Sequence, residues 1–383
     1  MKKDSMVSVR LTKPRQRKRT KGRSRVQLCS SGPPNQTIGL DLGDKTSRYC
    51  VLDAAGAVKS ERSVATTKSG MRQTFARIGH SRIALEVGTH SPLVSRLLQS
   101  LEHEVIVANA RRVRAITESS RKDDRMDAQM LARLARVDPG LLCPIRHRSE
   151  RAQQHLAMIK ARAALVEGRT ALVNAARGLT KSSGERLASC DTDQMGVEKL
   201  EGLPAAMQTA LQPLLEVVEG LTEKIQEYDR QLAEIARSEY PETALLEQIS
   251  GVGLLIALTF VLTLEDPQRF QRSREVGCYL GLRPKRRDSG ESQPQLRITK
   301  EGDVYLRKLL VQGAHCILGR RGPDTDLKRW GLKLAARGGK NAKKRALVAV
   351  ARKLAVLLHR LWVGGEVYEP LRHSQAPAAQ KIA

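Results

Sequence analysis

Four carboxylates in the first third of the sequence have the residue types and spacing of a divalent metal site. Asp41 and Glu86 each interrupt an apolar run that predicts a buried strand. A carboxylate buried in such a run requires a positive partner, because burying an uncompensated charge is costly. Asp124 and Asp127 are three residues apart and would project from one helix face. Together the four can form the oxygen cage that divalent cations need for in-line phosphoryl transfer.

A second group of residues could supply a nucleophile. Ser289 lies in the loop Lys285–Ser292, between arginines that would neutralise the oxygens of a phosphodiester. Ser292 is the alternative hydroxyl, and an ordinary polar loop is the simplest interpretation. The basic residues expected to contact nucleic acid here are Arg286, Arg287, Arg297 and Lys300.

The turn Ile249–Gly253 resembles the turn of a helix-hairpin-helix motif. Gly251 and Gly253 would let backbone amides point outward at the start of the next helix, where a phosphate can bind. A Gly-x-Gly turn is also common between ordinary helices, so both interpretations stay open.

The elements expected between residues 37 and 137 explain how the carboxylates could meet. The predicted strands are Thr37–Gly43, Arg48–Asp53, Val58–Ala65, Arg82–Val87 and Glu104–Asn109, with helices near Ser69–Ile78, Pro92–Glu102 and Asp124–Arg136. Three hairpin-linked strands followed by helix–strand alternation predict a mixed sheet with helices on both faces, the layout of the ribonuclease-H-like fold. Asp41 would lie on the first strand and Glu86 at the end of the fourth.

Residues 150–240 show apolar side chains at sustained spacings of three and four, which predict two long helices packed as an antiparallel coiled coil. Pro213 is expected to begin the second helix. The seam would contain Leu214, Val218, Leu221 and Ile225. A spacer and a dimerising arm explain this pattern equally well, and the second predicts a dimer or tetramer.

The sequence therefore predicts an α/β part followed by an all-α part. The expected segments are a disordered basic arm (1–36), a nuclease-like domain (37–149), a coiled-coil arm (150–240), a helical C-terminal domain with the helix-hairpin-helix-like turn and the serine loop (241–365), and a disordered tail (366–383).

Charge and composition restrict the partners and the compartment. The 383 residues carry a net charge of +27, of which +17 remains outside Met1–Arg25, so a nucleic acid partner is expected. The six cysteines form no Cys-x-x-Cys pair, which favours free thiols in a reducing compartment. The longest apolar run, Val252–Leu264, is too short to span a bilayer. We expect a cytoplasmic protein that does not bind membranes.

Several motifs in order resemble the DEDD-type transposases of insertion sequences, the family of the Piv invertase and the bridge-RNA-guided recombinases. They are Gly-Leu-Asp-Leu-Gly (39–43), Ala-Leu-Glu (84–86), Asp-Arg-Met-Asp-Ala (124–128), Ile-Ser-Gly-Val-Gly (249–253), Tyr-Leu-Gly-Leu-Arg-Pro (279–284), Asp-Ser-Gly (288–290) and Arg-Ile-Thr-Lys-Glu-Gly-Asp (297–303). The resemblance covers most of residues 37–363.

This resemblance implies a RuvC-like metal site at Asp41, Glu86, Asp124 and Asp127, and a serine nucleophile at Ser289. It implies a transposase or site-specific recombinase that cuts and rejoins DNA with Mg²⁺ and is guided by an RNA of the element. Two other functions remain open. One is a RuvC-like structure-specific nuclease, such as a junction resolvase, with water as the nucleophile. The other is a non-catalytic nucleic-acid-binding protein.

Overall fold

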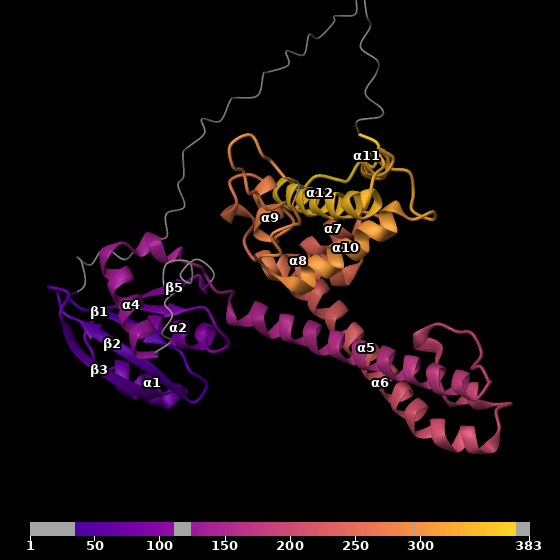
Figure 1. Ribbon diagram of the computed structural model, residues 1–383, viewed down its shortest axis with the longest axis horizontal. Coiled ribbons are helices and arrows are strands. Elements are labelled where there is room, and N and C mark those ends of the chain that lie inside the picture. Colours follow the sequence, from indigo (N-terminus) through magenta and orange to yellow (C-terminus); the bar gives the residue numbers. More distant parts are fainter. Residues whose placement is uncertain (1–34, 111–123, 295, 373–383) are drawn as a thin grey trace, which may run out of the picture. The chain divides into compact units, whose positions relative to one another are not determined.

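The computed structural model describes residues 35–110, 124–294 and 296–372, and of Asp124 it describes the backbone alone. The basic arm predicted for residues 1–36 and the tail predicted for 366–383 lie largely outside the described residues. The chain forms two compact units, which we call the N-terminal unit (within residues 1–147) and the C-terminal unit (within residues 148–383). Each is described by itself (Figure 1).

A five-stranded mixed sheet forms the N-terminal unit. Its strands are β1 (Thr37–Asp41), β2 (Thr46–Leu52), β3 (Val58–Ala65), β4 (Arg82–Glu86) and β5 (Glu104–Ala108), in the order β3-β2-β1-β4-β5. The pairs β1–β2 and β2–β3 are antiparallel, whereas β1–β4 and β4–β5 are parallel. The predicted mixed sheet is confirmed, and its order is consistent with a ribonuclease-H-like fold.

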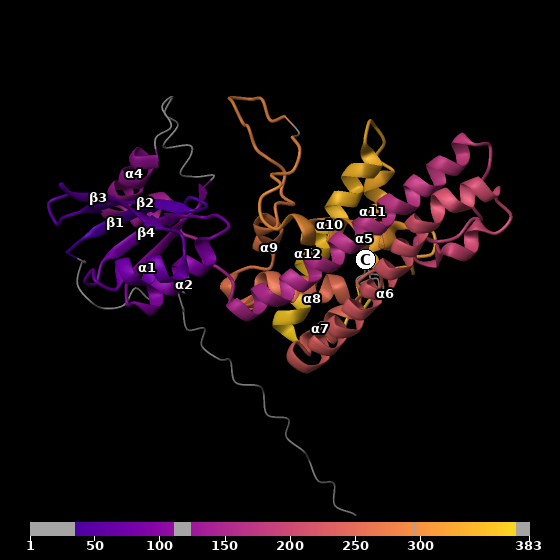
Figure 2. The ribbon, with the colours of Figure 1, turned by 90° about the horizontal axis from the view of Figure 1, so that it is seen from below.

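Helices cover both faces of this sheet, as Figure 2 shows. On one face, α1 (Lys68–Phe75) and α2 (Ser91–Ser100) pack against Ile38, Leu40 and their neighbours. On the other face lies α4 (Asp124–Val137), which is followed by the short helix η1 (Pro139–Leu142). Alternate strand residues point to opposite faces, so each strand serves two cores.

The helix α4 lies close to the sheet because β1 has a glycine beneath it. A Cβ atom at Gly39 would come within 1.9 Å of the carbonyl oxygen of Ala128 and 2.5 Å of the amide nitrogen of Ala132. Ala128 and Ala132 are themselves buried against Cys50 and Leu52 of β2. Small residues on the helix and a glycine on the strand therefore bring the two backbones together.

The C-terminal unit begins with two long antiparallel helices, α5 (Glu150–Ser182) and α6 (Ala205–Glu239). Arg162 of α5 donates to both carboxylate oxygens of Asp229 on α6, at 2.6 and 2.9 Å. Of the predicted seam, Val218 and Ile225 are buried, whereas Leu214 and Leu221 are half-buried.

The prediction that Pro213 begins the second helix is wrong. The helix starts at Ala205, directly after Pro204, and Pro213 lies in its interior. A proline removes one backbone donor, but Leu211 and Leu215 on either side of it are fully buried. The burial of these side chains favours a continuous helix despite the lost hydrogen bond.

Helices also form the core of the remaining C-terminal unit. They are α7 (Glu242–Glu247), α8 (Leu254–Leu264), α9 (Arg274–Tyr279), α10 (Val304–Leu318), α11 (Asp326–Ala335) and α12 (Ala342–Gly364), with the short η4 (Pro267–Arg269). The helix α8 is apolar on all sides and is buried from Ile256 to Leu264. The helix α12 buries Val350, Leu354, Leu358 and Leu361 in the same core. Within residues 35–110, 124–294 and 296–372, no helix has the length and apolar character needed to span a membrane.

Candidate functional site

Asp41 and Glu86 lie side by side where two neighbouring central strands of the sheet reach their carboxyl ends. Each is the last residue of its strand, and Leu40 of β1 pairs with Leu85 of β4 in parallel register. One step further along, both strands therefore end in a carboxylate. Neighbouring strands are about 4.8 Å apart, so the two side chains share a small volume. We call this place, together with the first turn of α4, the carboxylate edge.

Both side chains face α4. Gly39, two residues before Asp41, points at the backbone of Ala128. Ala84, two residues before Glu86, packs with Leu131 of α4. Because side chains alternate along a strand, Asp41 and Glu86 lie on this same face. Both are half-buried.

The direction of α4 brings its first turn to the same edge. Arg82 at the start of β4 donates to the carbonyl oxygen of Ala135 near the end of α4, at 3.2 Å. The helix therefore runs antiparallel to β1 and β4, and it begins at their carboxyl ends. Asp127 precedes the buried Leu131 by one helical turn and is itself exposed.

Carboxylate oxygens at such an edge are suitable ligands for a hard divalent cation. Asp41 and Glu86 would supply two such carboxylates, from neighbouring strands and on the same face of the sheet. Among the side chains that the structure describes, no three His, Cys, Asp or Glu residues close on one point as a metal cage would require. The remaining ligands predicted from the sequence would come from the first turn of α4.

Two histidine contacts beside the carboxylate edge were missed by the sequence analysis. His90 lies 3.3 Å from Asp44 (Nε2 to Oδ1), which joins the loop after β4 to the loop after β1. Ser91, fully buried at the start of α2, lies 2.9 Å from His147 (Oγ to Nε2). The available signal was that His90 and Asp44 follow Glu86 and Asp41 closely in sequence.

The predicted serine nucleophile lies in the C-terminal unit, at the tip of a hairpin of residues 282–300 that we call the serine hairpin. The amide of Ser289 donates to the carbonyl of Ser292 at 3.2 Å, and the amide of Ser292 donates back at 3.0 Å. Gly290 between them has a φ of +54°, as expected for a tight two-residue turn. Ser289 and Ser292 are both exposed, and Figure 2 shows the hairpin projecting from the helices.

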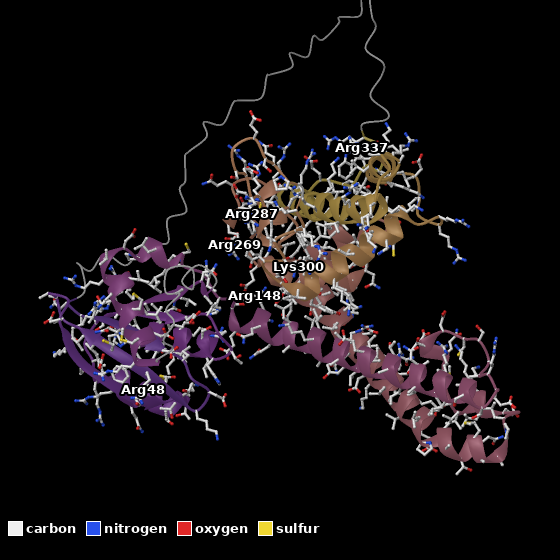
Figure 3. All side chains as sticks on the ribbon, viewed as in Figure 1. Arg48, Arg148, Arg269, Arg287, Lys300 and Arg337 are labelled. Carbon is white, nitrogen blue, oxygen red and sulfur yellow. The ribbon has the colours of Figure 1, made fainter. Side chains whose placement is uncertain are left out.

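The predicted phosphate contacts surround this hairpin. The side chains of Arg286, Arg287, Arg297 and Lys300 are exposed. At its base, the guanidinium of Arg269 stacks on the ring of Tyr279, 4.9 Å from the centroid. Figure 3 shows Arg287, Arg269 and Lys300 on this side of the C-terminal unit.

A buried arginine clamps the base of the serine hairpin, and the sequence analysis did not identify it. Arg307 of α10 is 8% exposed. Its Nη1 donates to the carbonyls of Leu280 and Glu301 at 3.0 and 2.7 Å, which lie on the two sides of the base. Gly281 and Gly302 allow these sides to touch, because a Cβ at either would come within 2.1 Å of the opposite backbone. The signal in the sequence was a cation beside the apolar residues of α10.

The glycine turn lies between α7 and α8. Gly251 has a φ of +89° and packs on α10, where a Cβ atom would lie 2.9 Å from the carbonyl oxygen of Gly313. Gly253 is exposed and precedes the first residue of α8. Gly251 is thus explained by helix packing, whereas Gly253 is exposed and stays a candidate phosphate contact.

Carboxylates on a mixed sheet and hydroxyls on a basic hairpin are features of an enzyme that acts on nucleic acid phosphates. Comparison with known proteins agrees with this class. A transposase model of the DEDD, IS110 type matches residues 38–183, and the model of the transposase IS116/IS110/IS902 family matches residues 243–329. The chain belongs to this family of insertion-sequence transposases, as the motifs predicted, and is therefore an enzyme that acts on DNA.

Similar proteins carry corresponding names. The transposase for insertion sequence element IS1111A of Coxiella burnetii is 28% identical over 86% of this chain and 90% of its own length. A probable family 20 transposase of Pseudomonas aeruginosa is 28% identical over 87% of this chain and 98% of its own. The transposase for insertion sequence element IS1328 of Yersinia enterocolitica is 26% identical over 75% and 85%.

Proposed function

We propose that this transposase cuts and rejoins DNA with a Mg²⁺-dependent site at Asp41, Glu86, Asp124 and Asp127 and with Ser289 as the nucleophile. The observation that carries the proposal is the carboxylate edge. Asp41 and Glu86 end two adjacent parallel strands on the face covered by α4, and Asp124 and Asp127 belong to the first turn of that helix.

The carboxylates would orient the scissile phosphate by holding the cation that it shares. A bound divalent cation neutralises charge on the phosphate oxygens and makes the phosphorus more electrophilic. Asp41 and Glu86 would be well oriented for this role, because each side chain is half-buried at the end of a hydrogen-bonded strand. The histidine contact between His90 and Asp44 would hold the two loops that border the edge.

The Ser289 hydroxyl would attack the phosphorus. In that step an Oγ–P bond forms, the P–O3′ bond breaks, and the hydroxyl proton passes through solvent to the departing 3′ oxygen. The products are a phosphoserine and a free 3′ hydroxyl, and the reverse attack by another 3′ hydroxyl reseals a strand. The exposed Arg286, Arg287 and Arg297 would neutralise the phosphate during the attack.

The proposal extends to partners. The +17 charge outside the N-terminal segment supports binding of a guide RNA as well as DNA. Gly253 and Lys300 would add backbone and side-chain contacts to phosphates. The helices α5 and α6 would act as a coiled-coil arm that joins two or four copies, because Leu214 and Leu221 keep part of their apolar surface outside the helix pair.

Incubation with labelled duplex DNA carrying an element end would test this function. We expect cleavage and a covalent protein–DNA adduct with Mg²⁺, and neither with a chelator. Phosphoamino-acid analysis after nuclease digestion should give phosphoserine. Cleavage without an adduct would favour the junction-nuclease alternative with water as nucleophile. Binding without cleavage under any divalent cation would favour the non-catalytic alternative.

A further inference from the structure

A polar groove beside the carboxylate edge has no role in the proposed chemistry. It lies between α4 and the strands β2 and β3, and it contains a cavity of about 250 Å³. Its lining includes Arg48 and Cys50 of β2, Glu61 of β3, and Arg125 of α4. Ligand pockets for small molecules are usually larger and mostly apolar, at roughly 300 to 1,000 Å³. This groove is instead small and charged.

The groove begins next to Asp41. Arg48 is the direct cross-strand partner of Asp41 in the antiparallel pair of β1 and β2. Directly opposed residues point to the same face of a sheet, so Arg48 also lies on the face that α4 covers. Figure 3 labels Arg48 on the N-terminal unit. A phosphate held at the carboxylate edge would therefore have a guanidinium beside it.

Three arginines of α4 continue the positive charge away from that edge. Arg125 forms an ion pair with Glu61, and Arg136 donates to the carbonyl of Ala54 at 2.7 Å, in the turn between β2 and β3. Arg133 lies between them and is near enough to the Cys50 thiol to affect its pKa, which burial and Glu61 raise and Arg133 and Arg125 lower. The span from Arg125 to Arg136 is about 16 Å, which covers several phosphates of one strand at about 3.4 Å each.

Of Arg48 and the three arginines of α4, two have guanidinium groups that are available for a ligand. Arg125 is neutralised by Glu61, and Arg136 already contacts a carbonyl. Arg48 and Arg133 are exposed, and neither forms a hydrogen bond or ion pair with another residue that the structure describes. Arg48 lines the groove, and Arg133 lies on α4 within electrostatic reach of Cys50, which also lines it. Unpaired arginines in and beside a polar groove can hold the oxygens of a phosphate backbone.

We propose that this groove and the adjoining surface of α4 bind the sugar–phosphate backbone of the nucleic acid strand that leaves the carboxylate edge, with Arg48 in the groove and Arg133 on α4 as the phosphate contacts. The inference rests on the proposed function, because it takes the carboxylate edge as the cleavage site. It also gives the strand a direction, from the carboxyl end of β1 along α4 towards the turn between β2 and β3. Glu61 has a positioning role, since it holds Arg125 and with it the first turn of α4.

Photocrosslinking tests the groove without cleavage. We would place p-benzoylphenylalanine at Ser63, an exposed β3 residue that pairs with Arg48, in the full-length protein. A matched probe would replace Gln73, which is exposed on α1 at the opposite face of the sheet. In a chelator, we expect a labelled single-stranded 20-mer to crosslink at position 63 and not at 73. Arg48→Gln with Arg133→Gln should lower that yield by about tenfold or more.

Arg72→Gln with Arg77→Gln provides the control, since it removes equal charge from exposed residues on the α1 side. Its crosslinking yield should stay within about twofold. Two outcomes would contradict nucleic acid binding in the groove: equal losses of crosslinking in both double variants, or equal crosslinking at positions 63 and 73. Either would indicate general attraction of a basic protein for a polyanion. Crosslinking at position 63 in a protein that cleaves no DNA would support nucleic acid binding in the groove and contradict the proposed catalytic function.

Discussion

The carboxylate edge and the serine hairpin place their functional groups by opposite means. Asp41 and Glu86 end hydrogen-bonded strands in the middle of a sheet and are half-buried beneath a helix. Ser289 stands at an exposed turn that backbone hydrogen bonds with Ser292 close, and the side-chain clamp of its hairpin is at the base. The core of the N-terminal unit therefore positions the carboxylate edge, whereas local hydrogen bonds and the Arg307 clamp position the serine hairpin.

The largest effect should come from Ser289→Ala. The exposed hydroxyl contributes nothing to packing, so folding and DNA binding should be unchanged. Adduct formation should fall by about three orders of magnitude or more if Ser289 is the nucleophile. Gel analysis of the covalent adduct checks this, with Ser292→Ala as the matched control across the turn. An adduct retained in Ser289→Ala and lost in Ser292→Ala would transfer the role to the second hydroxyl.

A slightly smaller loss is expected from Glu86→Gln or Asp41→Asn. These changes keep the shape of the side chain but remove a charge from the proposed cation site, so cleavage should fall by about a hundredfold or more. The melting temperature should hold or rise, because one of two adjacent like charges has been removed. Cleavage assays across a Mg²⁺ titration would measure the loss. Glu102→Gln, at an exposed position after α2, should behave as wild type.

Arg307→Met should show how far the serine depends on its clamp. The substitution leaves the carbonyls of Leu280 and Glu301 without their donor inside the protein, which should cost about 2 to 4 kcal/mol of stability. We expect faster proteolysis within residues 282–300 and a slower rate of adduct formation. Arg307→Lys should restore part of both.

The exposed Arg320→Met is the matched control and should change the free energy of unfolding by less than about 0.5 kcal/mol. If Arg307→Met reduces stability while the adduct rate of the folded protein is unchanged, the clamp serves folding alone.

The smallest effect concerns the helix pair. Leu221→Glu adds a charge at a half-buried position on α6 and should reduce the molar mass in light scattering if copies associate there. Ile225→Glu is the contrasting variant, because Ile225 is 4% exposed within the chain. That change should destabilise the helix pair by about 3 kcal/mol. If folded Leu221→Glu has an unchanged molar mass, α5 and α6 act as a spacer and not as a dimerising arm.

Much of the N-terminal unit could be predicted from sequence because its strands are short apolar runs with clear boundaries. The strand Val58–Ala65 has the predicted bounds, and the four others differ by one or two residues at their ends. The same pattern placed Glu86 at the end of the fourth strand and Asp41 on the first strand, where the structure makes Asp41 the last residue. Their common face depends on register, which Gly39 and Ala84 reveal only when α4 is in place.

The contacts that sequence analysis missed join residues distant along the chain. Arg48 and Arg125 line one groove because β2 and α4 pack together, and no local spacing signals that. Arg307 reaches Leu280 through tertiary structure, across 27 positions. Pro213 shows the reverse case, since a strong local signal for a helix start was overridden by the burial of Leu211 and Leu215.

The close approach at Gly39 has a consequence for which ion the enzyme would use. Any side chain at this position would push α4 outward, because a Cβ atom would overlap the carbonyl of Ala128. Metal–oxygen distances tolerate only about 0.2 Å, and Mg²⁺ is stricter than Ca²⁺ in its geometry. Gly39→Ala would therefore widen the gap between strand and helix ligands and favour a larger cation. A residue with no functional group would thus set the ion preference of the enzyme.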